Sequence, residues 1–384
     1  MSSSTALADD FTVIRRFFDH IDNRTTDTGT VTWREPVANY TSPERLAAEL
    51  ALMRRHPTPF CPSAALPDLG SYVARSAAGI PLLVVRGSDG RVRAFRNACR
   101  HRGAQVAAGA GCDKAFQCRY HGWTYGTDGA LLHVPHEHGF PGLDKSERGL
   151  VAVTCVERRG IVFVTQDEPA LAPSPPLEAL PPLIDSSYRA MRVEAVENPV
   201  EANWKVVVES FLEGYHIRST HRETFYPLQY DNLNVIESFG NNSRVAFPYR
   251  SINKYRNAPP HEHSSDGTLT YVYHLFPNAM VATFPGRIFM VVIEPISLER
   301  SCILTYLTTA HAAGDDEAEE RMTSASQLVD AGGAEDRAMT EAIQRGMATG
   351  ANQFFEYGLF ESAIVHFHRT LGAALGEARQ AHGA

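Results

Sequence analysis

The sequence has few cysteines, no long apolar run and no excess of basic charge, and each absence excludes a class of protein. Six cysteines are too few for a disulfide framework in a chain of 384 residues. No apolar run approaches the roughly 18 residues that a membrane-spanning helix needs. The formal net charge of −8 provides no basic surface for nucleic acid or for an anionic membrane. The composition therefore predicts a globular protein with neither kind of partner.

Two further signals are missing. The first ten residues have neither the basic nor the apolar region of a secretory signal, so we expect a cytoplasmic protein in a reducing compartment. The chain also lacks the Gly-x-Gly-x-x-Gly fingerprint of a dinucleotide site. The sequence therefore gives no sign of a nicotinamide site of that type.

Two cysteine–histidine pairs are the most informative residues that the sequence does contain. One residue separates Cys99 from His101, two separate Cys118 from His121, and sixteen lie between the pairs. A structural zinc site uses the same residue types, but zinc fingers keep their cysteines together and their histidines together. Two thiolates on one iron and two imidazoles on the other describe a Rieske [2Fe–2S] cluster. The spacing favours that cluster over zinc.

A second group of potential ligands follows in the second half of the chain. On a helix, Glu209, Glu213 and His216 lie at positions i, i+4 and i+7 and share one face. His221 would leave that face, so the helix should end or distort near 218–220 if both imidazoles bind one ion. Two histidines and one carboxylate are the ligands of many non-haem Fe(II) sites. Taken alone, these residues also fit a solvated helix face.

Both groups resemble the ring-hydroxylating oxygenase family of Rieske non-haem iron enzymes. The match includes Cys99-Arg-His-Arg-Gly, Cys118-Arg-Tyr-His-Gly-Trp, and the segment from Asn203-Trp-Lys to His221. Respiratory and photosynthetic Rieske proteins carry an extra disulfide-forming cysteine beside each pair, where this sequence has Ala104 and Tyr120. The oxygenase type is therefore favoured, and the resemblance covers about residues 40–370.

The resemblance implies a role for each group of residues. The cluster would be held by Cys99, His101, Cys118 and His121. The mononuclear Fe(II) would be bound by His216 and His221 and by a carboxylate, Asp336, which lies in a Glu-Asp segment eight residues before Gln344-x-Gly. Glu335 and Glu341 are the alternative carboxylates. Glu213 would link the two metal centres, at a position where many members have Asp and one branch has Glu.

The expected fold is α+β and has four parts. We predict N-terminal helices over 1–58 that pack on the catalytic domain or on a neighbouring subunit, and a small all-β Rieske domain over 59–166. A linker with six prolines follows at 167–184. An antiparallel sheet flanked by helices, of the helix-grip (START-like) type, would form the catalytic domain over 185–384.

The resemblance also implies the reaction. Such a chain is a terminal oxygenase that uses O₂ and electrons from NAD(P)H, delivered by a reductase with or without a ferredoxin. It would act as a homotrimer on a small aromatic or quaternary ammonium compound. Because the Glu213 branch contains monooxygenases, we favour hydroxylation or oxidative demethylation over cis-dihydroxylation of an arene. The non-enzyme alternative, an electron carrier or redox sensor, leaves the second group of ligands unexplained.

Overall fold

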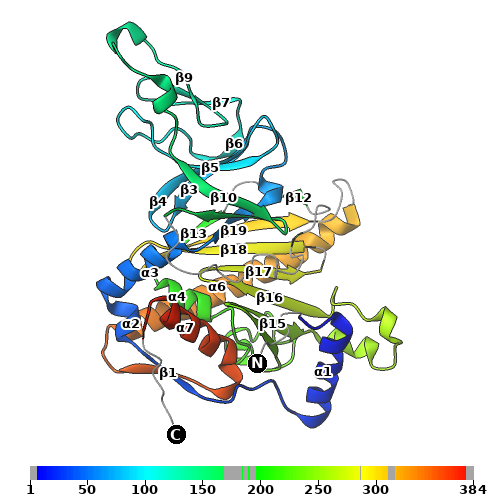
Figure 1. Cartoon of the computed structure of the whole chain (residues 1–384). Coiled ribbons are helices and arrows are strands. Elements are labelled where there is room, and N and C mark those ends of the chain that lie inside the picture. The colour runs from blue at the N-terminus through cyan, green and yellow to red at the C-terminus, as the bar shows by residue number, and fades with distance from the viewer. Residues whose placement is uncertain are drawn as a thin grey trace. The chain divides into compact units, whose positions relative to one another are not determined.

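The computed structural model describes residues 7–167, 184, 189–190, 196–285, 287–309 and 316–377, with side chains of the last range from 327. The chain forms two compact units (Figure 1). One contains residues 1–52, 197–305 and 309–384, and the other contains residues 53–196 and 306–308. The linker predicted over 167–184 lies almost wholly outside the described residues, so its boundaries stay a prediction. None of the described helices has the length and apolar character of a membrane span.

The unit of residues 53–196 is an all-β structure. Its seven-stranded antiparallel sheet has the order β2 (Thr58–Pro62), β11 (Ile161–Thr165), β10 (Ala152–Arg158), β5 (Val92–Arg96), β4 (Ile80–Arg86), β3 (Ser71–Ala77) and β6 (Gly109–Cys112). A smaller sheet consists of β7 (Ala115–Gln117), β8 (Thr124–Gly126) and β9 (Leu131–His133). Strands β4 and β5 form a hairpin across the turn at 87–91, and β5 leads into the loop that contains Cys99. Short 3₁₀ helices occur at Ser63–Ala65, Glu137–Gly139 and Lys145–Glu147.

The other unit is built on an antiparallel sheet. Its strands are β14 (Val235–Phe239), β15 (Asn242–Pro248), β16 (Leu269–Leu275), β17 (Ala279–Phe284), β18 (Arg287–Pro295) and β19 (Ser301–Thr309), neighbours in that order. Every residue of β16 and of β18 is buried. Both faces of these strands are therefore covered, and the antiparallel sheet expected from the sequence is confirmed. Short strands β12 (Arg189–Ala190) and β13 (Val196–Val200) lie where the chain passes between the units.

The helices that follow residue 200 accompany this sheet (Figure 1). They are α4 (Trp204–Glu209), α5 (Ile217–Thr220), α6 (Asp316–Met347) and α7 (Ser362–Ala374). Helix α4 contacts β18 and α6, and α7 contacts β14 and β15. Short 3₁₀ helices occur at Arg250–Tyr255, Pro260–Glu262 and Leu359–Glu361. Helices α4, α5 and α6 carry or border the second group of predicted ligands.

The N-terminal segment contributes α1 (Asp10–Asn23), β1 (Trp33–Pro36), α2 (Ala38–Thr41) and α3 (Pro43–Arg55). Helix α1 packs on β14, and Arg244 donates to the carbonyl of Ala8 at 2.7 Å. Strand β1 pairs with β20 (Phe354–Tyr357) near the other end of the chain. The helices expected within 1–58 are present, and the Ser42 hydroxyl caps α3 by accepting from the N–H of Arg45 at 3.0 Å. The N-terminal segment therefore packs on the unit that contains the sheet β14–β19.

Candidate metal centres

The first candidate centre is formed by two loops with the same backbone hydrogen bonds. The loop after β5 contains Cys99, whose N–H donates to the carbonyl of Ala104 at 2.8 Å, while the N–H of Gly103 donates to the carbonyl of Cys99 at 2.9 Å. The loop between β7 and β8 repeats both bonds, at 2.8 and 2.9 Å, with Cys118, Trp123 and Gly122. Both glycines have φ values near +80°, which glycine adopts without the strain of other residues. The two loops are therefore local copies of one another.

The side chains of these loops converge. The Nδ1 atoms of His101 and His121 lie 3.1 Å apart. Two donors bound at about 2.1 Å to one metal ion lie roughly 3.0 to 3.4 Å apart, so this spacing fits imidazoles on the same iron. Cys99 and Cys118 are 4% and 2% exposed, whereas His121 is exposed. The donor set therefore fits a cluster with a buried thiolate side and an accessible imidazole side.

Neighbouring aromatic side chains hold this arrangement in place. The indole of Trp123 stacks on the imidazole of His101, with ring centroids 5.1 Å apart and planes 10° apart. The hydroxyl of Tyr125 lies 3.2 Å from Sγ of Cys99 and accepts a hydrogen bond from the N–H of Arg100 at 2.9 Å. Because the Tyr125 oxygen already accepts from that N–H, its own proton can point at the cysteine sulfur. All six cysteines of the chain are free.

The second group of residues does not lie on the single helix that we expected. Helix α4 ends at Glu209, and α5 begins only at Ile217, so the expectation that Glu209, Glu213 and His216 share one helical face is wrong. The physical reason is local. The carboxylate of Glu213 accepts hydrogen bonds from the N–H groups of Tyr215 and His216, which a continuous helix would give to carbonyl oxygens. Helix α5 does end at Thr220, within the segment where a break was expected.

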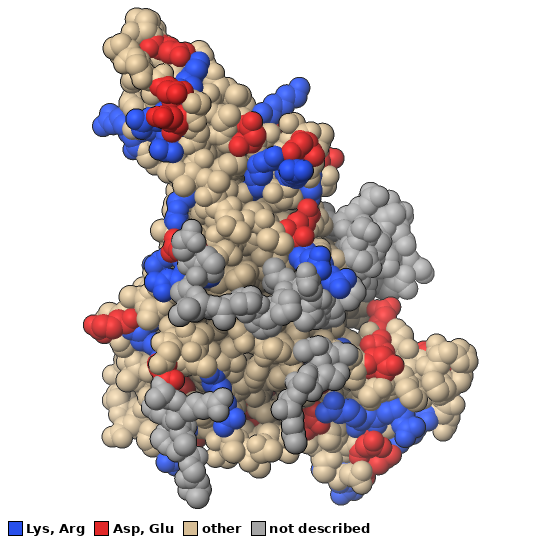
Figure 2. All heavy atoms as spheres, in the orientation of Figure 1, with Lys and Arg blue, Asp and Glu red and all other residues tan. Residues whose placement is uncertain are grey.

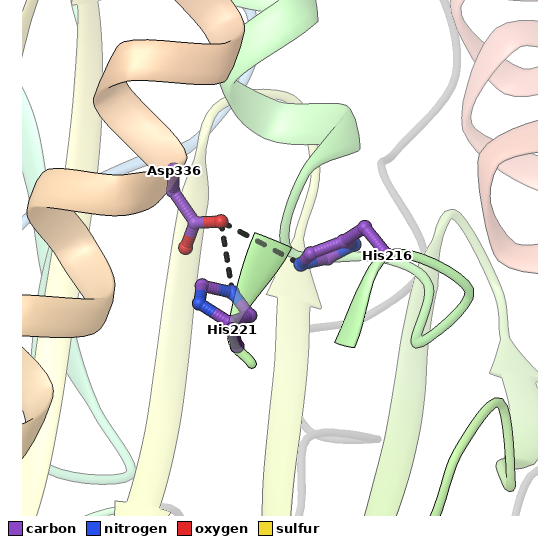
Figure 3. A group of neighbouring side chains, drawn as sticks. All are labelled: His216, His221 and Asp336. Atoms are coloured by element: carbon purple, nitrogen blue, oxygen red, sulfur yellow. Dashed lines mark ion pairs between the residues drawn. The ribbon is translucent and has the colours of Figure 1, made fainter. Parts of the chain in front are cut away.

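Three of the predicted ligands meet in space (Figure 3). The ligand atoms of His216, His221 and Asp336 all lie within 4.8 Å of one another. Oδ1 of Asp336 is 3.0 Å from Nε2 of His221 and 3.5 Å from Nε2 of His216. Three donors held at right angles by one ion at about 2.1 Å lie roughly 3 Å apart, so the set fits a facial site. Glu335 and Glu341 are not part of this group; Glu341 instead accepts from the N–H of Glu201 at 3.4 Å.

The Nδ1 atom of each of the two imidazoles contacts a carboxylate. Nδ1 of His216 contacts Oε1 of Glu213, and Nδ1 of His221 lies 2.8 Å from Oε2 of Glu335. The hydroxyl of Thr224 donates to the same Glu335 oxygen at 2.6 Å. Such partners fix the orientation of an imidazole and leave its Nε2 lone pair for a metal ion. Sequence reasoning identified Glu335 only as an alternative ligand and missed this role.

The charges of the site favour a cation. Burial alone would lower the pKa of His216, but the hydrogen bond and charge of Glu213 and the charge of Asp336 raise it above its ordinary value. Burial alone would raise the pKa of Glu335, but its hydrogen bonds with Thr224 and His221 lower it. The carboxylates of Glu213 and Asp336 thus stabilise positive charge on His216, and a bound divalent ion would satisfy the same need.

Buried contacts connect the segments that carry these ligands. Asn203 caps α4, and its N–H donates to Oε1 of Gln344 on α6 at 2.8 Å. The ammonium of Lys205 is 2.8 Å from the carboxylate of Glu49, and both side chains are almost fully buried. These contacts involve residues of the Asn-Trp-Lys and Gln-x-Gly motifs. The Asn203–Gln344 bond therefore joins α4 to α6 and the Lys205–Glu49 pair joins α4 to α3, although none of these residues belongs to the ligand group.

Glu209 belongs to a separate buried network. Its carboxylate accepts hydrogen bonds from the hydroxyls of Tyr40 and Tyr357 at 2.7 and 2.8 Å, and lies 2.9 Å from Nε2 of His368. Nδ1 of His368 is in turn 3.5 Å from the carboxylate of Glu35. His368 therefore belongs to the interior of this unit and not to the ligand group.

A cavity of about 540 Å³ opens beside the three ligands. His216, His221 and Asp336 all line it. The rest of its lining is mainly apolar and includes five phenylalanines, Phe211, Phe225, Phe247, Phe284 and Phe289. A small organic molecule of this volume would therefore be held directly against the ligand group.

This pair of sites on an all-β unit and a helix-flanked antiparallel sheet defines a Rieske-type oxygenase. The model for the Rieske [2Fe-2S] domain matches residues 56–157, and the model for the ring-hydroxylating alpha subunit (catalytic domain) matches residues 187–377. The chain belongs to the Rieske ring-hydroxylating oxygenase family. It is the terminal oxygenase of such a system, with the [2Fe–2S] cluster, the mononuclear iron, O₂ and reductase-supplied electrons that this family uses.

Relatives include oxygenases of two kinds. The chain is 26% identical to choline monooxygenase of Beta vulgaris over 78% of this chain and 68% of that protein. It is 25% identical to the carnitine monooxygenase oxygenase subunit of Escherichia coli K12, over 80% and 84%. A quaternary ammonium Rieske monooxygenase with L-carnitine superposes with a TM-score of 0.74 at 20% identity, over 90% and 96%. Naphthalene 1,2-dioxygenase from Rhodococcus sp. superposes with 0.73 at 19%, over 96% and 98%.

Proposed function

We propose that this terminal oxygenase inserts one oxygen atom into a quaternary ammonium compound, by hydroxylation or by oxidative removal of an N-methyl group. The observation that carries the proposal is the phenylalanine-lined cavity beside His216, His221 and Asp336. Aromatic faces attract a cation that has no N–H donors of its own. The choline and carnitine monooxygenases among the relatives act on cations of this kind.

The proposal assigns the two groups of ligands. Cys99, His101, Cys118 and His121 hold the [2Fe–2S] cluster, and His216, His221 and Asp336 hold the mononuclear iron. When bound, the cluster supplies single electrons and the iron supplies the site of O₂ activation. The phenylalanines orient the substrate and exclude water from the reacting carbon.

Glu213 and Glu335 position the two imidazoles in this proposal. Each carboxylate accepts the Nδ1 proton of one histidine, so that the proton stays on Nδ1 and Nε2 faces Asp336. Glu213 has a further role, because it is the residue through which we expect the cluster of one subunit to communicate with the iron of the next. This requires a closed head-to-tail homotrimer, with electrons from NAD(P)H arriving through a reductase, directly or through a ferredoxin.

A second candidate function is cis-dihydroxylation of an arene. Its support is the apolar character of the cavity lining, which would also hold a flat hydrocarbon against the same three ligands. Reaction products distinguish the two candidates, because a dihydroxylated arene retains both oxygen atoms of one O₂ molecule and a monooxygenation product retains one.

Turnover with isotopically labelled oxygen tests the proposal. The purified chain would be supplied with a reductase, NADH and ¹⁸O₂, and offered trimethylammonium compounds and simple arenes in parallel. We expect oxidation of a trimethylammonium compound, with one labelled atom in the product or in released formaldehyde. Formation of a doubly labelled cis-diol from an arene, with no oxidation of the ammonium compounds, would replace the proposal by the second candidate.

The role of Glu213 has a test of its own. Glu213→Ala should bind Fe(II) more weakly, because His216 loses its Nδ1 partner, but should still hold both metal centres when saturated with Fe(II). In that saturated state it should lose nearly all product formation, while Glu223→Ala, an exposed neighbour in the same segment, should behave as the unmodified chain. Normal coupled turnover by Glu213→Ala would remove Glu213 from the electron route.

Transfer between subunits can be tested by mixing two inactive variants. Cys118→Ser removes a cluster ligand, and Asp336→Ala removes an iron ligand. Neither should turn over alone, but trimers assembled from both chains should recover a part of the activity. If co-assembled material stays inactive while its trimers contain both variants, electrons do not pass between subunits.

A further inference from the structure

The cavity beside the iron ligands has one wall that attracts a cation. Phe284 and Phe289 lie on β17 and β18, with ring centroids 5.3 Å apart and planes 80° apart. Phe225 lies against the imidazole of His221, at a centroid distance of 4.8 Å. These rings line the cavity and are buried or half-buried. A trimethylammonium group would find aromatic faces here but no carboxylate committed to it.

The acidic side chains that line the cavity each lie near a histidine or an arginine of this chain. Asp336 faces the two Nε2 atoms, and Glu213 contacts Nδ1 of His216. Asp330 lies near Arg287: burial lowers the pKa of Arg287, and the charge of Asp330 opposes that effect. Asp330, Glu213 and Asp336 are the acids in the lining, so each has a histidine or an arginine nearby.

Arg337 is the cation of the lining that lacks such a partner. It follows Asp336 on α6, its side chain is half-buried, and it lines the cavity. Its guanidinium makes no hydrogen bond or ion pair with any residue in the described part of the chain, whereas its backbone carbonyl accepts from the hydroxyl of Thr340 at 3.0 Å. The donors of this guanidinium are therefore not committed to another side chain, and their planar arrangement matches a carboxylate.

We infer that Arg337 binds a carboxylate of the substrate, so that the substrate is a zwitterion with a quaternary ammonium group at one end and a carboxylate at the other. The ammonium group of this substrate follows from the proposed function, and the carboxylate follows from Arg337. An alcohol with the same cationic head would leave the guanidinium unpaired. A site whose charged group pairs with the substrate binds an analogue without the partner group much more weakly. The carboxylate compound should therefore bind at least tenfold more tightly than the alcohol.

Binding rather than turnover provides the direct test. Calorimetry would compare trimethylammonium carboxylates having one to three carbons between nitrogen and carboxylate with the alcohols of the same length. The iron-loaded chain would be used anaerobically, as the unmodified form and as Arg337→Gln, Arg337→Lys and Arg345→Gln. Arg345 is exposed, lies on the same helix and does not line the cavity, so it is the matched control. The thermal midpoints of the variants would show that each one folds.

We expect at least one carboxylate to bind at least tenfold more tightly than its alcohol. Arg337→Gln should remove that preference by weakening the acid tenfold or more and the alcohol less than twofold, and Arg337→Lys should retain a part of it. Equal binding of the acid by Arg337→Gln and by the unmodified chain would overturn the inference, as would a preference of the unmodified chain for the alcohol.

A second ligand series separates this inference from the proposed function. If no quaternary ammonium compound binds, the proposed substrate class is wrong, and benzoate would then be compared with benzamide on the same variants. Benzoate binding that is lost in Arg337→Gln would keep Arg337 as the carboxylate site without the ammonium requirement. Benzoate binding unaffected by Arg337→Gln, or no preference for benzoate over benzamide, would overturn the inference.

Discussion

The N–H of Asn203 donates a 2.8 Å hydrogen bond to Oε1 of Gln344. Asn203 is fully buried at the start of α4, and Gln344 lies two turns beyond Asp336 on α6. This bond joins the segment that leads to His216 to the helix that supplies the carboxylate. It therefore fixes the distance between ligands that are far apart in the sequence.

Removing that acceptor should weaken both the fold and the iron site. Gln344→Ala leaves the buried N–H of Asn203 without its partner, which should cost about 1 to 3 kcal/mol in the free energy of unfolding. Urea unfolding would measure this cost, and an anaerobic Fe(II) titration would measure the accompanying loss of affinity. Gln344→Glu retains an acceptor and should lose less than Gln344→Ala. Equal losses in the two variants would argue against the hydrogen bond as the cause.

Glu335 should matter for iron binding although it is not among the ligands. Its carboxylate lies 2.8 Å from Nδ1 of His221, so Glu335→Gln should lower the affinity for Fe(II) by roughly 10- to 100-fold. Glu341→Gln, on the same helix but outside the ligand group, is the control. Competition with a chelator of known affinity would measure the change. An unaltered affinity in Glu335→Gln would exclude the orienting role.

Tyr125 should raise the reduction potential of the cluster. Its hydroxyl lies 3.2 Å from Sγ of Cys99, and a hydrogen bond to a ligand sulfur stabilises the reduced, more negative cluster. Removing a bond worth about 1 kcal/mol should lower the potential of a one-electron couple by about 40 mV. Redox titration of Tyr125→Phe, followed by its visible spectrum, would measure the shift. A higher potential in this variant would contradict the assignment.

His274 should make the fold sensitive to mild acid. It is fully buried on β16, and burial lowers its pKa from 6.5 to about 4. Between these values the unfolded chain binds a proton that the folded chain does not, so stability is intact above pH 6.5 and falls as the pH decreases toward 4. The loss approaches about 3 kcal/mol. His274→Gln should show a smaller drop in thermal midpoint between pH 7 and pH 5; an equal drop would assign the acid sensitivity to other groups.

Local patterns in the sequence were sufficient for the cluster loops and for the sheet. Cys99, His101, Cys118 and His121 lie on short loops after strands, where spacing along the chain limits how far apart the side chains can lie. The antiparallel sheet expected within 185–384 is also present. Asp336 was chosen by resemblance to a motif. The structure brings it beside His216 and His221, which lie more than a hundred residues earlier.

The sequence did not predict the contacts between segments that are distant along the chain. The break between α4 and α5 depends on the carboxylate of Glu213 accepting backbone N–H groups, and helical periodicity gives no signal for that. The pairing of β1 with β20 likewise joins segments that are hundreds of residues apart. The contact of Glu335 with His221 joins residues that are more than a hundred positions apart. The sequence also gives no signal that Arg337 lines the cavity, because segments that are distant in the sequence form its walls.

The central claim is that two separate metal centres occupy this chain. Measuring iron and acid-labile sulfide per chain, in the unmodified protein and in Asp336→Ala, tests this claim most directly. We expect about three irons and about two sulfides in the unmodified protein, and about two of each in the variant, with an unchanged spectrum of the reduced cluster. An unmodified chain that holds about two irons after full reconstitution, or a variant that still holds about three, would contradict the account.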